Sequence, residues 1–182
     1  AVVDTGYRPH VDLVANIVGG YDFIADTFVA NDGNGRDSDA KDPGDWSAAG
    51  ACYSGSPSSN SSWHGTHVAG TIGAVSNNAK GVAGINWNVK ILPIRVLGRC
   101  GGYTSDIIDG VVWAAGLPVA GVPANPYPAK VINMSLGGAH ICSPAEQMAI
   151  DAAVAAGAMI VVAAGNSNAD ASNYSPASCN NV

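Results

Sequence analysis

Short apolar runs alternate along the chain with segments whose apolar residues recur at helical spacing, which predicts strands alternating with helices. The predicted strands are residues 2–3, 89–97, 131–134 and 159–163. The predicted helices are residues 64–75, 104–116 and 144–157. Because the strands are apolar throughout, the pattern predicts one α/β domain of three layers, with a mostly parallel sheet covered by helices on both faces. No internal repeat or second domain is visible, and both ends look truncated.

Two of the predicted helices have recognisable starts. Thr104 precedes a helical apolar pattern and is predicted to be its N-cap. The run Ser143-Pro144-Ala145-Glu146 matches a capping box with proline at the first helical position.

A long polar stretch, residues 31–63, separates the first strand from the first helix and is rich in Asp, Gly, Ser and Asn. A loop of this length without structure of its own is usually functional or organised by a metal. Seven aspartates lie between Asp22 and Asp45, against only Arg36 and Lys41. Packing them would cost self-repulsion, so we expect a structural Ca²⁺ here, and a solvated acidic loop is the alternative. The expected ligands are Asp37, Asp39, Asp42 and Asp45.

Composition narrows the class of protein. The chain has 182 residues and a net charge of −6, with 47% hydrophobic and 12% charged residues, which is a compact globular profile. No basic patch exists, which argues against nucleic acid as a partner. The longest uncharged windows are broken by Pro, Gly, Asn and Ser, so no membrane span is predicted.

Four cysteines occur without CxxC spacing: Cys52, Cys100, Cys142 and Cys179. An even number in an acidic chain with few lysines predicts two disulfides and an oxidising compartment, with four unrelated buried thiols as the alternative. We favour Cys52–Cys100 and Cys142–Cys179, because the members of each pair fall in loops on the same side of the predicted sheet. Three pairings are possible, and the sequence does not decide among them.

Three polar residues stand at positions where parallel sheets collect functional groups. Asp4 ends the first strand, His64 opens the first helix, and Asn166 follows the last strand. A histidine there needs a carboxylate to act as a base, and Asp4 can supply it. A zinc site at His64 and His67 is the competing interpretation, but it lacks a third ligand, and we expect His67 to be a core histidine.

The motifs AVVDTG, HGTHVAG, NMSLGG and VVAAGN occur in this order over essentially the whole chain. Together they resemble the subtilisin-like serine peptidases, and the insert with DPGDW ahead of WHGTHVAG is most similar to bacterial extracellular subtilases. The resemblance implies that Asp4 orients His64, that His64 is the general base and that Asn166 donates to the oxyanion. It also implies a substrate-binding set with S1 walls at Ser135, Leu136, Gly137, Ala164 and Gly165, an edge segment at Gly101, Gly102 and Tyr103, and a pocket floor shortened by Tyr174.

The resemblance carries further expectations. In this family the nucleophilic serine lies late in the chain in a Gly-Thr-Ser-Met-Ala run, which is absent here, so we expect truncation and no activity from these residues alone. A calcium site is implied at Asp12 and the loop 75–82, through Val75, Asn77 and Val82, although this loop is one residue longer than usual. The expected protein is a secreted endopeptidase acting on proteins or peptides, with a propeptide or inhibitor as partner. A non-catalytic calcium-binding module and a zinc hydrolase are the alternatives.

Overall fold

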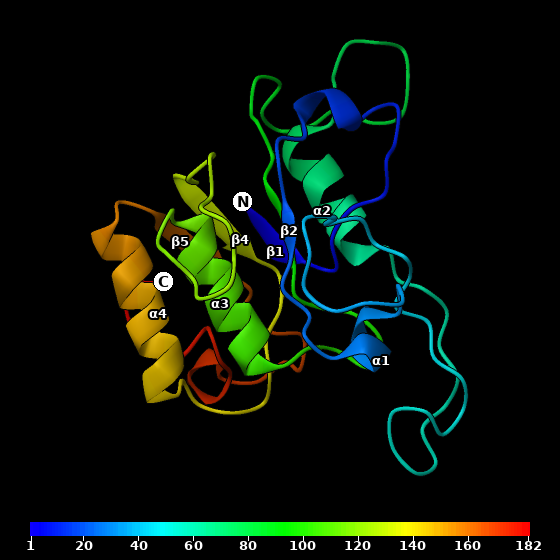
Figure 1. Ribbon diagram of the computed structural model, residues 1–182, viewed down its shortest axis with the longest axis vertical. Helices are drawn as coiled ribbons and strands as arrows, with labels where there is room; N and C mark the ends of the chain where they lie inside the picture. Colours follow the sequence, from blue (N-terminus) through cyan, green and yellow to red (C-terminus); the bar gives the residue numbers. More distant parts are fainter.

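Five strands form one parallel sheet at the centre of the computed structural model, which describes all 182 residues (Figure 1). The strands stand in the order β2-β3-β1-β4-β5. Their bounds are β1 (Val2–Asp4), β2 (Tyr21–Asp22), β3 (Pro93–Arg95), β4 (Val131–Met134) and β5 (Met159–Val162). Every pairing between them is parallel, which confirms the predicted sheet.

Helices cover both faces of this sheet. They are α1 (Thr27–Ala30), α2 (His64–Gly73), α3 (Thr104–Ala114) and α4 (Pro144–Ala155), with 3-10 turns at Val14–Asn16 and Ala171–Asn173. Successive residues of β1 point to opposite faces. Val2 therefore packs with Ala69 of α2, whereas Val3 joins the larger core under α3 and α4. In Figure 1, α2 accordingly lies on one side of the sheet, and α3 and α4 lie on the other.

The predicted helices and strands are present. The helices end two residues earlier than predicted, β4 has the predicted bounds, and β1 extends one residue further, to Asp4. The strand expected over residues 89–97 is reduced to β3, and the short elements β2 and α1 were not predicted. The N-cap expected at Thr104 was wrong, because Tyr103 occupies that position with an extended backbone and no side-chain cap. The capping box of α4 is confirmed: the Ser143 amide donates to Glu146 Oε2 at 2.8 Å, and the Glu146 amide donates to Ser143 Oγ at 3.3 Å.

Both favoured disulfides, Cys52–Cys100 and Cys142–Cys179, are present. The first joins residues 48 positions apart and ties the loop that projects at the lower right of Figure 1 to the turn after β3. The second joins the segment before α4 to the end of the chain. None of the helices has the length and hydropathy that crossing a bilayer requires.

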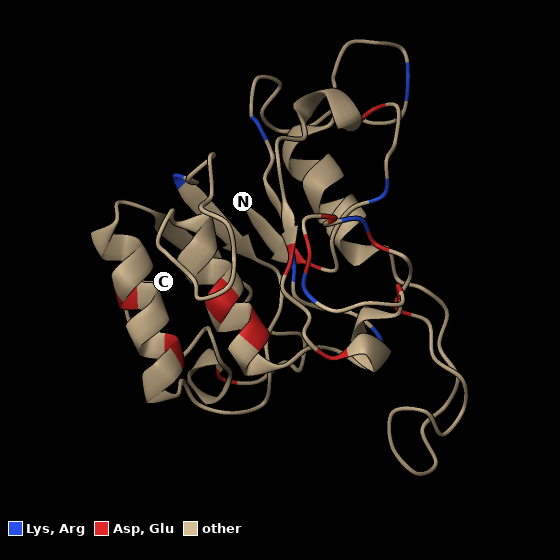
Figure 2. Ribbon diagram, viewed as in Figure 1, with Lys and Arg blue, Asp and Glu red and all other residues tan.

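The acidic residues in and after β2 pack around a buried cation that the sequence pattern did not indicate. Arg95 of β3 is fully buried, and its guanidinium contacts Asp22, the Ala30 carbonyl and Asp32 Oδ2, the last at 2.7 Å. Arg36, within the stretch, pairs instead with two aspartates of α3. Figure 2 shows the resulting interleaving of basic and acidic residues around the sheet end. Part of the aspartate charge is therefore balanced from within the chain.

Candidate active site

Asp4 and His64 are brought together at the carboxyl end of β1. The Nδ1 atom of His64 lies 2.8 Å from Asp4 Oδ1 and 2.9 Å from Oδ2. Asp4 is completely buried, while 46% of the His64 side chain is exposed. Burial raises the pKa of Asp4 above its ordinary value, and hydrogen bonds from His64 and from the Thr5 amide oppose this increase. The pair thus joins a buried carboxylate to an imidazole that reaches solvent.

Glycine at position 65 permits this contact. A Cβ atom there would lie only 2.2 Å from the Gly6 carbonyl oxygen, so no larger residue would let α2 approach β1 this closely. The preceding residue, Trp63, has a left-handed backbone with φ +53°, which is unusual for a bulky side chain. The guanidinium of Arg8 lies 5.3 Å from the centre of the Trp63 ring. These contacts fix the turn from which His64 projects.

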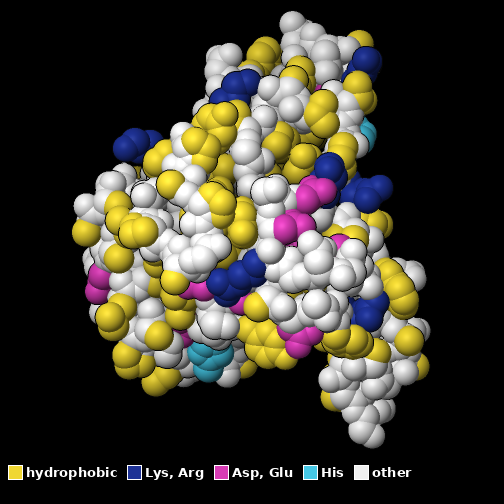
Figure 3. Space-filling view, viewed as in Figure 1, with side chains coloured by type: hydrophobic (Ala, Val, Ile, Leu, Met, Phe, Trp, Pro, Cys, Tyr) yellow, Lys and Arg dark blue, Asp and Glu magenta, His cyan; other side chains and the backbone are white.

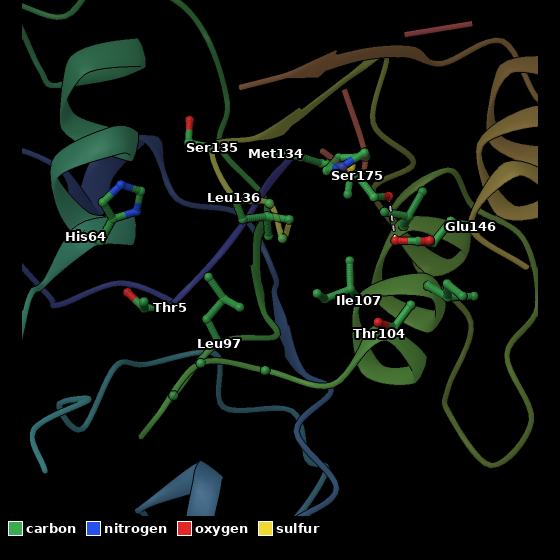
Figure 4. Close-up of a pocket in the computed structure, with 18 of the residues that line it drawn as sticks. Thr5, His64, Leu97, Thr104, Ile107, Met134, Ser135, Leu136, Glu146 and Ser175 are labelled. Carbon is green, nitrogen blue, oxygen red and sulfur yellow. Dashed lines mark hydrogen bonds between the residues drawn. The ribbon is translucent and has the colours of Figure 1, made fainter. Parts of the chain in front are cut away.

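His64 lines one end of a cleft of about 630 Å³ that extends toward α3 and α4 (Figure 4). Several residues expected to bind substrate line the same cleft, namely Gly101, Gly102, Ser135, Leu136 and Gly137. The Ser135–Gly137 segment is held at its end by two backbone hydrogen bonds between Gly138 and Ser175, of 2.9 and 3.1 Å. In Figure 3, basic and acidic side chains are interspersed on the face that is drawn.

The far wall of the cleft is mainly apolar. It is built from Ile107, Ile108 and Val111 of α3 and from Ala149 and Ile150 of α4. Apolar walls with few polar groups are typical of sites that bury a ligand side chain.

Glu146 is a cleft residue that the sequence pattern did not identify. Its carboxylate accepts hydrogen bonds from the Ser143 amide and, at 2.6 Å, from Ser175 Oγ (Figure 4). Burial acts to raise the pKa of Glu146, but these hydrogen bonds outweigh it and hold the pKa below its ordinary value. The capping box predicted where Glu146 stands on α4, but not that this helix end faces the cleft.

Replacing Glu146 with Gln is expected to remove a pH-dependent part of the stability. Because folding lowers this pKa, the stabilisation is fully present above the ordinary value of 4.5 and is lost as the pH falls through the folded pKa. The difference in melting temperature between wild type and variant, measured by calorimetry from pH 7 to 3, should therefore shrink at the acid end. A difference that stays constant over this range would show that the Glu146 charge plays no part.

Not all predicted site residues line the cleft. Ala164, Gly165 and Asn166 follow β5 at the same edge of the sheet, but they are exposed and do not line the cleft. A Cβ atom added to Gly165 would lie 3.8 Å from the ring of Tyr174, the residue expected to shorten the pocket floor. This loop therefore lies beside Tyr174. Tyr103 is 54% exposed and does not line the cleft either.

The loop expected to bind calcium surrounds Asp12. The Asp12 side chain is buried and accepts hydrogen bonds from Asn78 Nδ2 at 2.7 Å and from the Val82 amide at 2.9 Å. These bonds hold the pKa of Asp12 below its ordinary value. Val75 donates its amide to the Asp12 carbonyl at 2.7 Å. The side chain that hydrogen-bonds to Asp12 is thus that of Asn78. Calcium binding through Val75, Asn77 and Val82 stays a prediction.

The four aspartates expected to share an ion have separate partners. These contacts are Asp37 with Asn34, Asp39 with Lys41, Asp42 with Thr5, and Asp45 with Ser62. No group of three or more His, Cys, Asp or Glu side chains that could hold a metal is found. Calcium at the acidic stretch therefore stays a prediction.

The expectation that His67 belongs to the core was wrong, because His67 is exposed. His67 lies three positions after His64 on α2, and its side chain is open to solvent. His64 therefore differs from its neighbour by its contact with Asp4, at 2.8 Å.

Known proteins share this architecture. The subtilase family matches residues 1–182. The "Extracellular protease" of Xanthomonas campestris pv. campestris is 58% identical over 182 residues, which are all of this chain and 31% of that protein. The "Extracellular basic protease" of Dichelobacter nodosus is 53% identical over 187 residues, again 31% of its length.

A solved structure described as a protease from Pseudoalteromonas arctica is 60% identical to this chain. It superposes with a TM-score of 0.97, covering 98% of this chain and 52% of the other. The chain thus spans about a third of the curated relatives and half of the solved structure. From its sequence, its parallel sheet and these similarities, the chain belongs to the subtilase family.

Proposed function

We propose that this chain supplies the Asp-His part of the catalytic site of a secreted subtilisin-type serine endopeptidase, which hydrolyses peptide bonds in proteins through an Asp-His-Ser triad. The observation that carries the proposal is the buried Asp4 carboxylate within 2.8 Å of His64 Nδ1, at the end of a long cleft. These 182 residues contain no Gly-Thr-Ser-Met-Ala run, so the serine would come from a part of the protein outside them.

The geometry supports a specific catalytic role for each residue. Asp4 accepts the Nδ1 proton of His64, which leaves Nε2 as the base that takes the proton of the serine hydroxyl. The serine oxygen then attacks the substrate carbonyl, and the imidazolium returns the proton to the departing amine. Gly101 and Gly102 on one side of the cleft and Ser135–Gly137 on the other would pair with an extended substrate backbone.

The complete protein offers a direct test through chemical labelling. When the serine of a serine peptidase attacks the carbonyl of a peptidyl chloromethyl ketone, the reagent alkylates the histidine base of the triad. We expect inactivation together with one alkylated residue, His64, identified by peptide mass spectrometry, and unchanged labelling in the His67→Gln control. Labelling of another histidine, or a protein that hydrolyses no protein substrate, would favour a non-catalytic module.

Asn166 is proposed as an oxyanion donor in the complete site. Asn166→Leu is expected to lower kcat by about 10²- to 10³-fold, the loss established for removal of the oxyanion asparagine of subtilisin. KM should change little, because the amide meets charge that exists only in the transition state. Steady-state kinetics with a chromogenic peptide would separate the two constants, and a loss confined to KM would instead assign Asn166 to substrate binding.

A structural Ca²⁺ is proposed at the Asp12 loop. The fit rests on hard oxygen donors: the buried Asp12 carboxylate has lone pairs beyond those that accept N–H bonds, and residues 77–83 enclose a shallow hollow of about 350 Å³. A bound ion would cross-link residues 75–82 to Asp12 and would contribute about 2.7 kcal/mol at 100 times its dissociation constant. We expect excess EGTA to lower the melting temperature of the complete protein, and Asp12→Asn to weaken that response. Identical melting with and without chelator would exclude this role.

We also propose that the protein is secreted and that a propeptide or an inhibitor binds it. Two disulfides are consistent with an oxidising compartment, and the curated relatives are named as extracellular proteases.

A further inference from the structure

A second buried carboxylate lies behind the Asp4–His64 pair. Asp42 is 1% exposed. Its side chain contacts no cation: Oδ2 accepts from Thr5 Oγ1 at 2.8 Å, and Oδ1 accepts from the Gly44 amide at 2.8 Å. Arg8 bonds only to the main-chain carbonyl of this residue, at 3.3 Å. Burying a carboxylate without a direct ion pair is costly, which indicates that its position serves a purpose beyond filling space.

Thr5 connects Asp42 to both members of the catalytic pair. Its hydroxyl accepts from the Gly65 amide, in the first turn of α2, at 3.0 Å. Its own amide donates to Asp4 Oδ1 at 2.7 Å. One residue therefore touches the carboxylate and also the helix end that carries His64.

An ionised carboxylate can only accept hydrogen bonds, so Asp42 fixes the direction of the Thr5 hydroxyl proton. With that proton directed at Asp42, the hydroxyl lone pairs are left for the Gly65 amide. We infer that Asp42 is a positioning residue for the Asp4–His64 pair and acts through the hydroxyl of Thr5. This inference rests on the proposed function.

The test compares four variants of the complete enzyme with saturating Ca²⁺ in every assay, so that a change in calcium affinity does not contribute. Asp42→Asn leaves one acceptor for two donors, and Thr5→Val removes the hydroxyl while keeping the shape. Each is expected to lower kcat by about 10- to 100-fold with KM within about twofold, the size of loss that a small misplacement of a catalytic group causes. Thr5→Ser keeps the hydroxyl and should restore kcat to within a few fold of wild type. Asp151→Asn, at an exposed site on α4, should leave kcat unchanged.

The double variant Asp42→Asn/Thr5→Val separates positioning from general damage. Members of one hydrogen-bond chain are not additive, so its kcat should be no lower than that of the worse single variant. Three results would each overturn the inference. The first is a double variant in which the two losses of kcat multiply, and the second is a Thr5→Ser variant as slow as Thr5→Val. The third is an Asp42→Asn variant with a lowered melting temperature and normal kcat. An inactive wild-type protein would overturn the proposed function and this inference with it, whereas an active wild type with a normal Asp42→Asn variant would overturn only the inference.

Discussion

His64→Ala in the complete enzyme is expected to lower kcat by about 10⁶-fold, which is the loss established for the catalytic histidine of subtilisin. The imidazole is the base that takes the serine proton, and no other titratable side chain lies within hydrogen-bond distance of Asp4 to replace it. Some acceleration over the uncatalysed reaction, about 10³- to 10⁴-fold, should remain from substrate binding and oxyanion stabilisation.

The measurement is kcat with a chromogenic peptide. His67→Ala is the matched control, since it removes an exposed histidine from the same helix and should leave kcat unchanged. Inhibitor titration should be used to measure any contaminating wild-type enzyme. If the His64→Ala enzyme itself keeps more than a hundredth of wild-type kcat, the assignment of His64 as the base is contradicted.

Asp4→Asn is expected to lower kcat by about 10⁴-fold, the size of effect seen when the carboxylate of a serine triad becomes an amide. The amide can hold the ring but can also donate to it, which favours the tautomer with the proton on Nε2 and removes the base from the serine. The double variant with His64→Ala should be no slower than His64→Ala alone, because the two residues act as a unit. Multiplicative losses would show that they act independently.

Stability should move in the opposite direction from activity. Folding raises the pKa of Asp4, so the contribution of this residue to stability is greatest below the unfolded pKa of about 3.8 and declines as the pH rises through the folded pKa. Asparagine carries no charge at any pH. The melting temperature of Asp4→Asn should therefore match that of wild type near pH 3 and exceed it at pH 7. A variant that melts below wild type at pH 7 would show that the His64–Asp4 contact contributes more than burial costs.

The alternation of apolar runs was enough to predict the sheet and its covering helices, because the predicted strands are mainly apolar. Of these, β1 and β3 are buried on both faces, whereas β4 and β5 leave Val131, Met159 and Val161 exposed. What it did not reveal were elements held by tertiary contacts alone. The two-residue strand β2 exists because it pairs with β3, and α1 is a single turn capped by Asp26 just before the polar stretch. Neither carries a periodic apolar pattern of its own.

Within the site, sequence order placed Asp4 and His64 at the sheet edge where they meet. It missed residues whose roles depend on distant partners. Arg95 neutralises Asp22 and Asp32 from 73 and 63 positions away, and nothing in the local sequence around any of them indicates this. Glu146 was identified as a cap, but its place in the cleft follows from how α4 packs on α3.

The Cys52–Cys100 bond bears on how the protein withstands proteases, including copies of itself. The projecting loop that it anchors contains exposed small and polar residues, which are the usual sites of nicking. A single cut anywhere between residues 53 and 99 leaves the two pieces covalently joined through this bond. Nicked molecules would therefore migrate as intact chains on a non-reducing gel and separate into two only after reduction, and their Asp4 and His64 would stay on one molecule even when the cut falls between them.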